Sequence, residues 1–135
     1  MVVIALVAIA AGLISLSLRD PAATRLEHEA IRLAALLESA RAQSRASGLP
    51  VRWVPLPADA ADDFRFDGLF DAAELPRRWL DPQVSAEVAD ARGVVLGPEP
   101  LIGEQRIVLR LGAQRLALHT DGLAPFAPDD DAAPR

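Results

Sequence analysis

Residues 24–50, TRLEHEAIRLAALLESARAQSRASGLP, decide the fold of this chain. Leucine and alanine recur through them at steps of three and four residues, which places these side chains on one stripe of a helix. The stripe consists of Leu26, Ala30, Leu33, Leu37 and Ala40. Gly48 and Pro50 end the pattern, because glycine accepts the conformation that follows a last helical turn and proline cannot continue a helix. The stretch therefore predicts an amphipathic helix whose apolar stripe must be covered.

An uncharged apolar run, MVVIALVAIAAGLISLSL, occupies residues 1–18 and stops at Arg19. As a helix it would be about 27 Å long, close to the hydrocarbon thickness of a bilayer. We expect residues 1–18 to be the membrane-spanning half of one long helix and residues 19–48 to be its amphipathic half. Ala8 and Gly12 are small residues four apart, which either permits close helix packing or reflects the abundance of alanine.

Three interpretations of residues 1–18 stay open. A cleaved signal peptide would have a positively charged start and a shorter apolar core, and this run has neither. A simple signal anchor would place the following domain in the cytoplasm, because Arg19 and Arg25 flank the run on its downstream side only. In the third interpretation, Met1 is an internal methionine and a charged leader precedes it in the gene product.

Beyond Pro50 the hydrophobic period becomes two, which is typical of half-buried antiparallel strands. Alternating residues cover 51–54 and 64–67, and the runs 106–111 and 115–120 are separated by a hairpin-like loop at 112–114. Shorter apolar pieces predict strands at 84–88 and 94–96, and an edge strand at 123–126. The faces expected to cover the helix carry Trp53, Phe64, Phe66, Ile107, Leu109 and Leu116.

These elements predict an α+β protein in which a long N-terminal helix, membrane-spanning in its first half, packs on an antiparallel β-sheet head. Residues 49–127 form the head, and residues 128–135 form a free acidic tail. At 135 residues in all, the chain has room for one modest domain after the apolar run.

Neither histidine predicts a catalytic or metal site. His28 opens the string HEAIR, which has Arg32 where the zinc-protease pattern HExxH has its second ligand, and an arginine cation cannot bind zinc. We expect Glu29 on a solvated helix face near Arg32. The sequence has no GxSxG motif that would supply a nucleophile for His119. We expect His119 at an outer or edge position of the sheet.

The other residue types also form no catalytic or metal-binding pattern, so we predict no cofactor, no metal and no enzymatic activity. The chain has no cysteine, which excludes disulfides and thiolate ligands. The acidic groups lack the spacing of a calcium loop and are expected to be solvated. They are Asp59, Asp62 and Asp63, and Asp129 to Asp131.

The net charge of −5 disfavours nucleic acid as a partner, because phosphate binding needs concentrated positive charge. A local basic cluster in the folded head is the arrangement that would reverse this expectation. The arginines that could form it are Arg77, Arg78, Arg106, Arg110 and Arg115.

The run at residues 1–18 resembles the inner part of the hydrophobic segment of type IV pilins and type II secretion pseudopilins. That segment usually begins GFTLIEL, with peptidase cleavage after the glycine, N-methylation of the new first residue and a glutamate that guides assembly. None of these positions is present in the sequence, so none of these roles is assigned to a residue.

The resemblance becomes more specific further along the chain, where three segments are similar in order to those of the H-type minor pseudopilin. IRLAALLESARAQSRASGLPVRWV (31–54) resembles its helix and first strand, and FRFDGLFDAAELPRRWLD (64–81) resembles its aromatic strand with a following Trp-Leu pair. LALHTDGLAPF (116–126) resembles its last hairpin.

This resemblance implies a non-enzymatic minor pseudopilin that supports export of folded proteins by type II secretion. It implies a single pass through the bacterial inner membrane, a periplasmic head and assembly into a periplasmic pseudopilus. The implied partners are other major and minor pseudopilins, the inner-membrane secretion platform, membrane lipid and, if an upstream leader exists, prepilin peptidase. A minor pilin of a type IV pilus, with a possible part in DNA uptake, and a membrane-anchored periplasmic enzyme are the alternatives.

The residues expected to matter are therefore assembly residues. Leu26, Leu33, Leu37 and Trp53 are expected to join the helix to the head. Those expected in membrane storage and filament packing are Met1, Val2, Val3, Ile4, Leu6, Val7, Ala8, Gly12, Leu13, Leu16 and Leu18.

Overall fold

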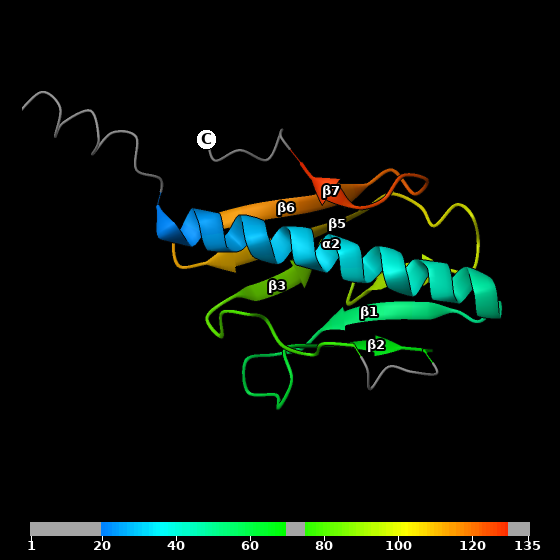
Figure 1. Ribbon diagram of the computed structural model, residues 1–135, viewed down its shortest axis with the longest axis horizontal. Helices are drawn as coiled ribbons and strands as arrows, with labels where there is room; N and C mark the ends of the chain where they lie inside the picture. The colour runs from blue at the N-terminus through cyan, green and yellow to red at the C-terminus, as the bar shows by residue number, and fades with distance from the viewer. Residues whose placement is uncertain (1–19, 70–74, 130–135) are drawn as a thin grey trace, which may run out of the picture.

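In the computed structural model, which describes residues 20–69 and 75–129, one helix lies across two antiparallel sheets (Figure 1). Helix α2 spans Pro21–Ser47. The strands are β1 Val51–Pro55, β2 Phe64–Asp67, β3 Ser85–Val88, β4 Val94–Gly97, β5 Gln105–Leu111, β6 Gln114–Thr120 and β7 Ala127–Pro128. One sheet has the order β2-β1-β4 and the other has the order β3-β5-β6-β7.

The predicted membrane run and its assembly residues, within 1–18, lie outside the described residues. In residues 20–69 and 75–129, no helix combines the length and the apolar character that crossing a bilayer requires.

Helix α2 begins and ends for identifiable chemical reasons. The carboxylate of Asp20 accepts the backbone N–H of Ala22 at 2.9 Å, and Pro21 occupies the first turn, where its missing N–H costs nothing. At the other end Gly48 has a φ of +73° and donates its N–H to the carbonyl of Ser44. The predicted helix end at Gly48 is confirmed.

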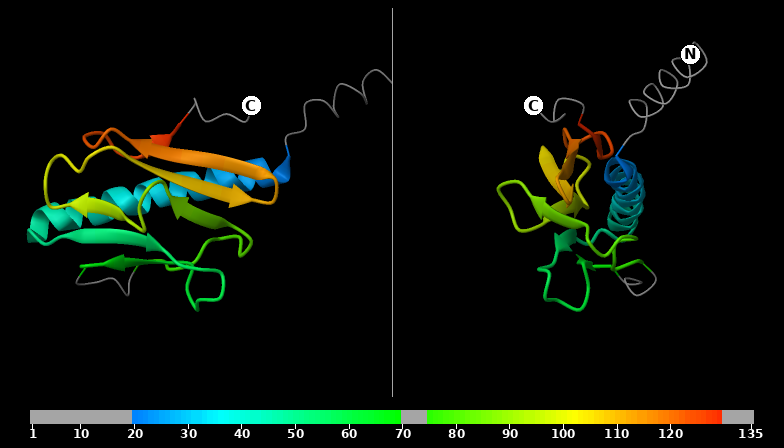
Figure 2. Two further views of the ribbon diagram at one scale, coloured as in Figure 1. Left: turned by 180° about the vertical axis from the view of Figure 1, so that it is seen from behind. Right: turned by 90° about the vertical axis from the view of Figure 1, so that its left-hand side faces the viewer.

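The core lies between α2 and both sheets, with the helix on one side and the strands on the other (Figure 2). Every residue of the predicted helix stripe is at most 1% exposed. Of the strand residues expected to cover the stripe, Leu116 is half-buried and the others are buried. Leu26, Leu33, Leu37 and Trp53, the residues expected to join helix and head, belong to this core.

Arg41 adds a polar connection at the C-terminal half of α2. Its side chain is buried, and its guanidinium donates to the carbonyls of Pro100 and Gly122 at 3.0 Å and of Ala124 at 3.3 Å. These acceptors belong to two loops, before β5 and after β6, so one side chain fixes both loops on the helix.

The C-terminal region differs from the sequence prediction. Residues 123–126 form no edge strand, because the chain bends at residues 122–124, where the Asp121 carboxylate accepts the N–H groups of Leu123 and Ala124 at 2.9 Å. Strand β7 follows this bend, and Pro128 pairs with Leu118. Asp129 forms an ion pair with Arg106, so the sheet and its contacts continue beyond the predicted boundary at residue 127.

The loop between β5 and β6 is also shorter than expected. Leu111 pairs with Gln114, so the turn consists of Gly112 and Ala113. Gly112 has a φ of +59°, as a two-residue hairpin turn requires.

Replacing Leu37 with aspartate should unfold the head. The Leu37 side chain is 1% exposed, and burying an unpaired carboxylate costs about 3 kcal/mol or more, a large part of the about 5–15 kcal/mol that stabilises a typical domain. Melting of the 135-residue chain in a non-ionic detergent, followed by tryptophan fluorescence, measures the loss. Ile31→Asp is the matched control, because Ile31 lies on the same helix and is 64% exposed. Equal melting temperatures for the Leu37 variant and the parent would contradict this packing.

Candidate functional site

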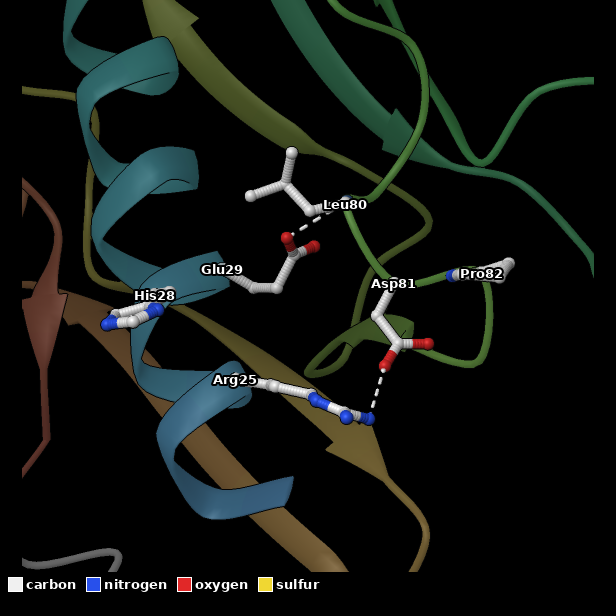
Figure 3. A pocket seen from close by; sticks show the side chains of 6 residues that line it. All are labelled: Arg25, His28, Glu29, Leu80, Asp81 and Pro82. Carbon is white, nitrogen blue, oxygen red and sulfur yellow. Dashed lines mark hydrogen bonds and ion pairs between the residues drawn. The ribbon is translucent and has the colours of Figure 1, made fainter. Parts of the chain in front are cut away.

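Residues 75–84, which we call the strap, lie along the N-terminal half of α2 and are held there by three helix side chains. Arg25 forms an ion pair with Asp81 at 3.3 Å, and Glu29 Oε1 accepts the backbone N–H of Leu80 at 2.9 Å (Figure 3). Arg32 donates to the carbonyl of Arg78 at 3.1 Å. The three helix residues are spaced by four and three, so they share one face, and the strap runs antiparallel to the helix.

Trp79 anchors the strap in the core. Its side chain is 7% exposed, and its ring centroid lies 4.8 Å from that of Phe64 and 6.3 Å from that of Trp53. Its backbone N–H donates to Asp63 Oδ2 at 2.8 Å. The next residue, Leu80, is 69% exposed. The Trp-Leu pair therefore places one large apolar side chain in the core and the other in solvent.

Glu29 is buried, which corrects the expectation of a solvated carboxylate. It is 1% exposed, and within the described residues its Oε2 has no hydrogen-bond partner. Desolvation raises the pKa of Glu29, while the Leu80 N–H and the Arg32 charge lower it and the nearby Asp81 and Asp63 carboxylates raise it. The net result is a pKa above the usual value for glutamate.

Two hollows adjoin the strap. One, of about 440 Å³, is lined by Arg25, His28, Glu29, Leu80, Asp81 and Pro82 (Figure 3). The other, of about 720 Å³, contains the side chains of Arg32, Asp62, Arg77 and Arg78, with apolar residues of the strap. The strap thus separates a hollow with a buried acid from one with three arginines.

The two histidines lie on different elements and are not brought together. His28 is exposed on α2, and His119 is half-buried on β6, where its Nε2 lies 2.9 Å from Glu104 Oε1. In the described part of the chain, no three histidine, aspartate or glutamate side chains gather as a metal site would require. Asp62 and Asp63, expected to be solvated, are half-buried and contact Arg77 and the Trp79 N–H, respectively.

The five arginines considered for nucleic-acid binding separate into two groups. Arg77 and Arg78 lie on the strap, whereas Arg106 and Arg110 lie on β5, with Arg115 opposite Arg110 on β6. Arg106 is paired with Asp129, and Arg110 is paired with Glu87 at 3.0 Å. The β5 arginines are therefore partly neutralised by carboxylates.

The sequence did not predict the strap contacts or the burial of Arg41. The sequence shows that Arg25, Glu29 and Arg32 share one helix face. Charged residues at this spacing are equally typical of an ordinary solvated face. A signal was present in the Trp-Leu-Asp string at 79–81, which the resemblance singled out without giving its partner.

The arrangement of α2 and the two sheets is similar to the crystal structure of the type IV minor pilin FimU from Pseudomonas aeruginosa. The TM-score is 0.61, the match covers 83% of this chain and 94% of that chain, and 13% of the residues are identical. The fold is pilin-like. At this identity the similarity shows the fold alone. No protein-family model matches the sequence, and no curated protein matches it.

Replacing Glu29 with glutamine should change how stability depends on pH. Because the folded-state pKa of Glu29 is raised, its stabilising contribution is complete below the unfolded-state pKa of about 4.3 and is lost as the pH rises through the folded-state pKa. Glu29→Gln removes this titration and keeps an acceptor for the Leu80 N–H. Urea unfolding between pH 4 and pH 8 should therefore show the variant gaining stability relative to the parent as the pH rises.

The matched control is Glu38→Gln, which removes a carboxylate from the same helix at a half-exposed position 3.7 Å from Arg45. Its pH profile should follow that of the parent. Parallel profiles for the Glu29 variant and the parent would show that burial does not raise the pKa of Glu29.

Proposed function

We propose that this chain is a structural minor subunit of a pilin-like filament, and specifically an H-type minor pseudopilin of a bacterial type II secretion system. The observation that carries the proposal is the pilin-like fold, in which α2 packs over two antiparallel sheets. The ordered resemblance of residues 31–54, 64–81 and 116–126 supports the specific assignment.

The use of the polar side chains is consistent with a mechanical role. Arg41, Glu29 and Arg25 each contact a backbone group or an opposite charge that holds a loop on the helix. Such contacts make a rigid head, which suits a subunit that transmits force. In this proposal residues 1–18 store the subunit in the inner membrane and later pack in the filament. The partners are other pseudopilins and the secretion platform.

A second candidate is a minor pilin of a type IV pilus, which the similarity to FimU favours. The fold is compatible with both systems, because pilins and pseudopilins share the helix-on-sheet design. For the version of this candidate that takes up DNA, Arg106 and Arg110 already face carboxylates, which leaves Arg77 and Arg78 on the strap as its basic residues.

Deletion of the gene in its own bacterium separates the two candidates. For a pseudopilin, exported proteins should accumulate in the periplasm while surface pili persist, and for a minor pilin the pili should be lost while secretion persists. Complementation with the parent gene should restore the lost process, and complementation with the Leu37→Asp variant should not. Normal secretion together with normal piliation would overturn the proposed function.

The DNA upstream of the Met1 codon provides an independent check. Read in frame, it should encode a short basic leader ending in glycine, followed by Phe-Thr-Leu and a glutamate. Mass spectrometry of the protein from its native host should then find an N-methylated residue after that glycine. An in-frame stop codon directly before Met1 would contradict processing by prepilin peptidase.

A further inference from the structure

The described residues that line the larger hollow beside the strap carry more positive than negative charge. Three guanidinium groups line it, Arg32 from α2 and Arg77 and Arg78 from the strap. Among the described lining residues, the carboxylate of Asp62 is the single negative charge. The hollow has a volume of about 720 Å³, which is enough to admit several side-chain groups.

Backbone carbonyls orient two of these guanidinium groups without neutralising them. Arg32 donates to the carbonyl of Arg78 at 3.1 Å, and Arg78 donates to the carbonyl of Ala61 at 2.9 Å. Because a guanidinium has five N–H donors, one such bond fixes its direction and leaves further donors for a ligand. The two arginines are therefore partly preorganised.

Arg77 is the one of the three with an ion pair among the described residues. The partner oxygen, on Asp62, lies 3.8 Å away, which is beyond hydrogen-bond distance, and half of the Arg77 side chain is exposed. Arg78 is also exposed, so two of the three guanidinium groups are open to a ligand carboxylate.

This local excess contrasts with the rest of the molecule. The chain has a net charge of −5, and four arginines elsewhere form ion pairs with carboxylates at 3.3 Å or less. These pairs are Arg25 with Asp81, Arg65 with Asp67, Arg106 with Asp129, and Arg110 with Glu87. A positive hollow on an acidic protein is suited to an acidic partner, since opposite charges fix the register of docking.

We propose that this hollow binds the carboxylate side chains of an acidic peptide segment on a partner protein. Guanidinium groups bind planar carboxylates through paired hydrogen bonds, and several arginines around one cavity strengthen this recognition. The apolar walls formed by Leu75, Pro76 and Trp79 can contact the aliphatic stems of glutamate side chains. A nucleic acid fits less well, because it requires a longer track of unpaired cations, and the β5 arginines are paired.

Binding of a dye-labelled hexaglutamate peptide to the 135-residue chain in non-ionic detergent tests the proposal. Fluorescence polarisation should show saturable binding that weakens as sodium chloride is added, and hexaglutamine with the same dye should not bind. Arg77→Gln should weaken binding about fivefold. The matched control is Arg115→Gln, which removes the same charge from an exposed position on β6 and should change the affinity less than about twofold.

A second variant, Asp62→Asn, should change the affinity for hexaglutamate in the opposite direction. It tests the proposal even if the Arg77 variant folds poorly. Removing the internal carboxylate frees Arg77 and should tighten hexaglutamate binding about threefold. No saturable binding, equal losses in the Arg77 and Arg115 variants, or tighter binding of a single-stranded oligonucleotide than of hexaglutamate would each overturn the proposal. The assay requires no filament, so its result is independent of the secretion and piliation phenotypes.

Discussion

Burial of the apolar stripe of α2 is the constraint on which the rest of the structure depends. The stripe packs on strands of both sheets, so a single helix provides the common support for the two halves of the head. A helix of 27 residues is about 40 Å long, which is enough to cross both sheets. The position of each sheet is thus set relative to the helix, and the loops that join the strands must adapt to that arrangement.

Buried polar side chains also attach the loops to α2, and these side chains differ between the two halves of the helix. Arg41 donates to three backbone carbonyls in the core, whereas Glu29 accepts one backbone N–H and its burial raises its pKa. The difference follows from the number of partners each group finds. Arg41 has five donors to distribute over two loops, while the Glu29 carboxylate meets one backbone N–H from the strap.

The sequence was sufficient for the features that depend on local periodicity. It predicted the end of α2 at Gly48, the strands at 51–54 and 64–67 and the hairpin of β5 and β6, because each pattern repeats within a few residues. It was insufficient for the strap, whose contacts join residues 46, 51 and 56 positions apart. The edge strand at 123–126 was wrong because the side chain of Asp121 imposes a bend that alternation does not reveal.

The strap makes the surface of the head asymmetric, which is a property that the proposed role as a filament subunit requires. In a filament each subunit meets its neighbours through different surfaces, so a head-to-tail contact joins two unlike patches. The strap contributes the exposed Leu80 to a hollow with a buried acid, and Arg77 and Arg78 to a hollow with three arginines. Because Trp79 fixes this segment in the core, the hollows beside the strap keep their places relative to the helix. The aromatic core that stabilises the fold therefore also positions the charged surface on which the proposed binding depends.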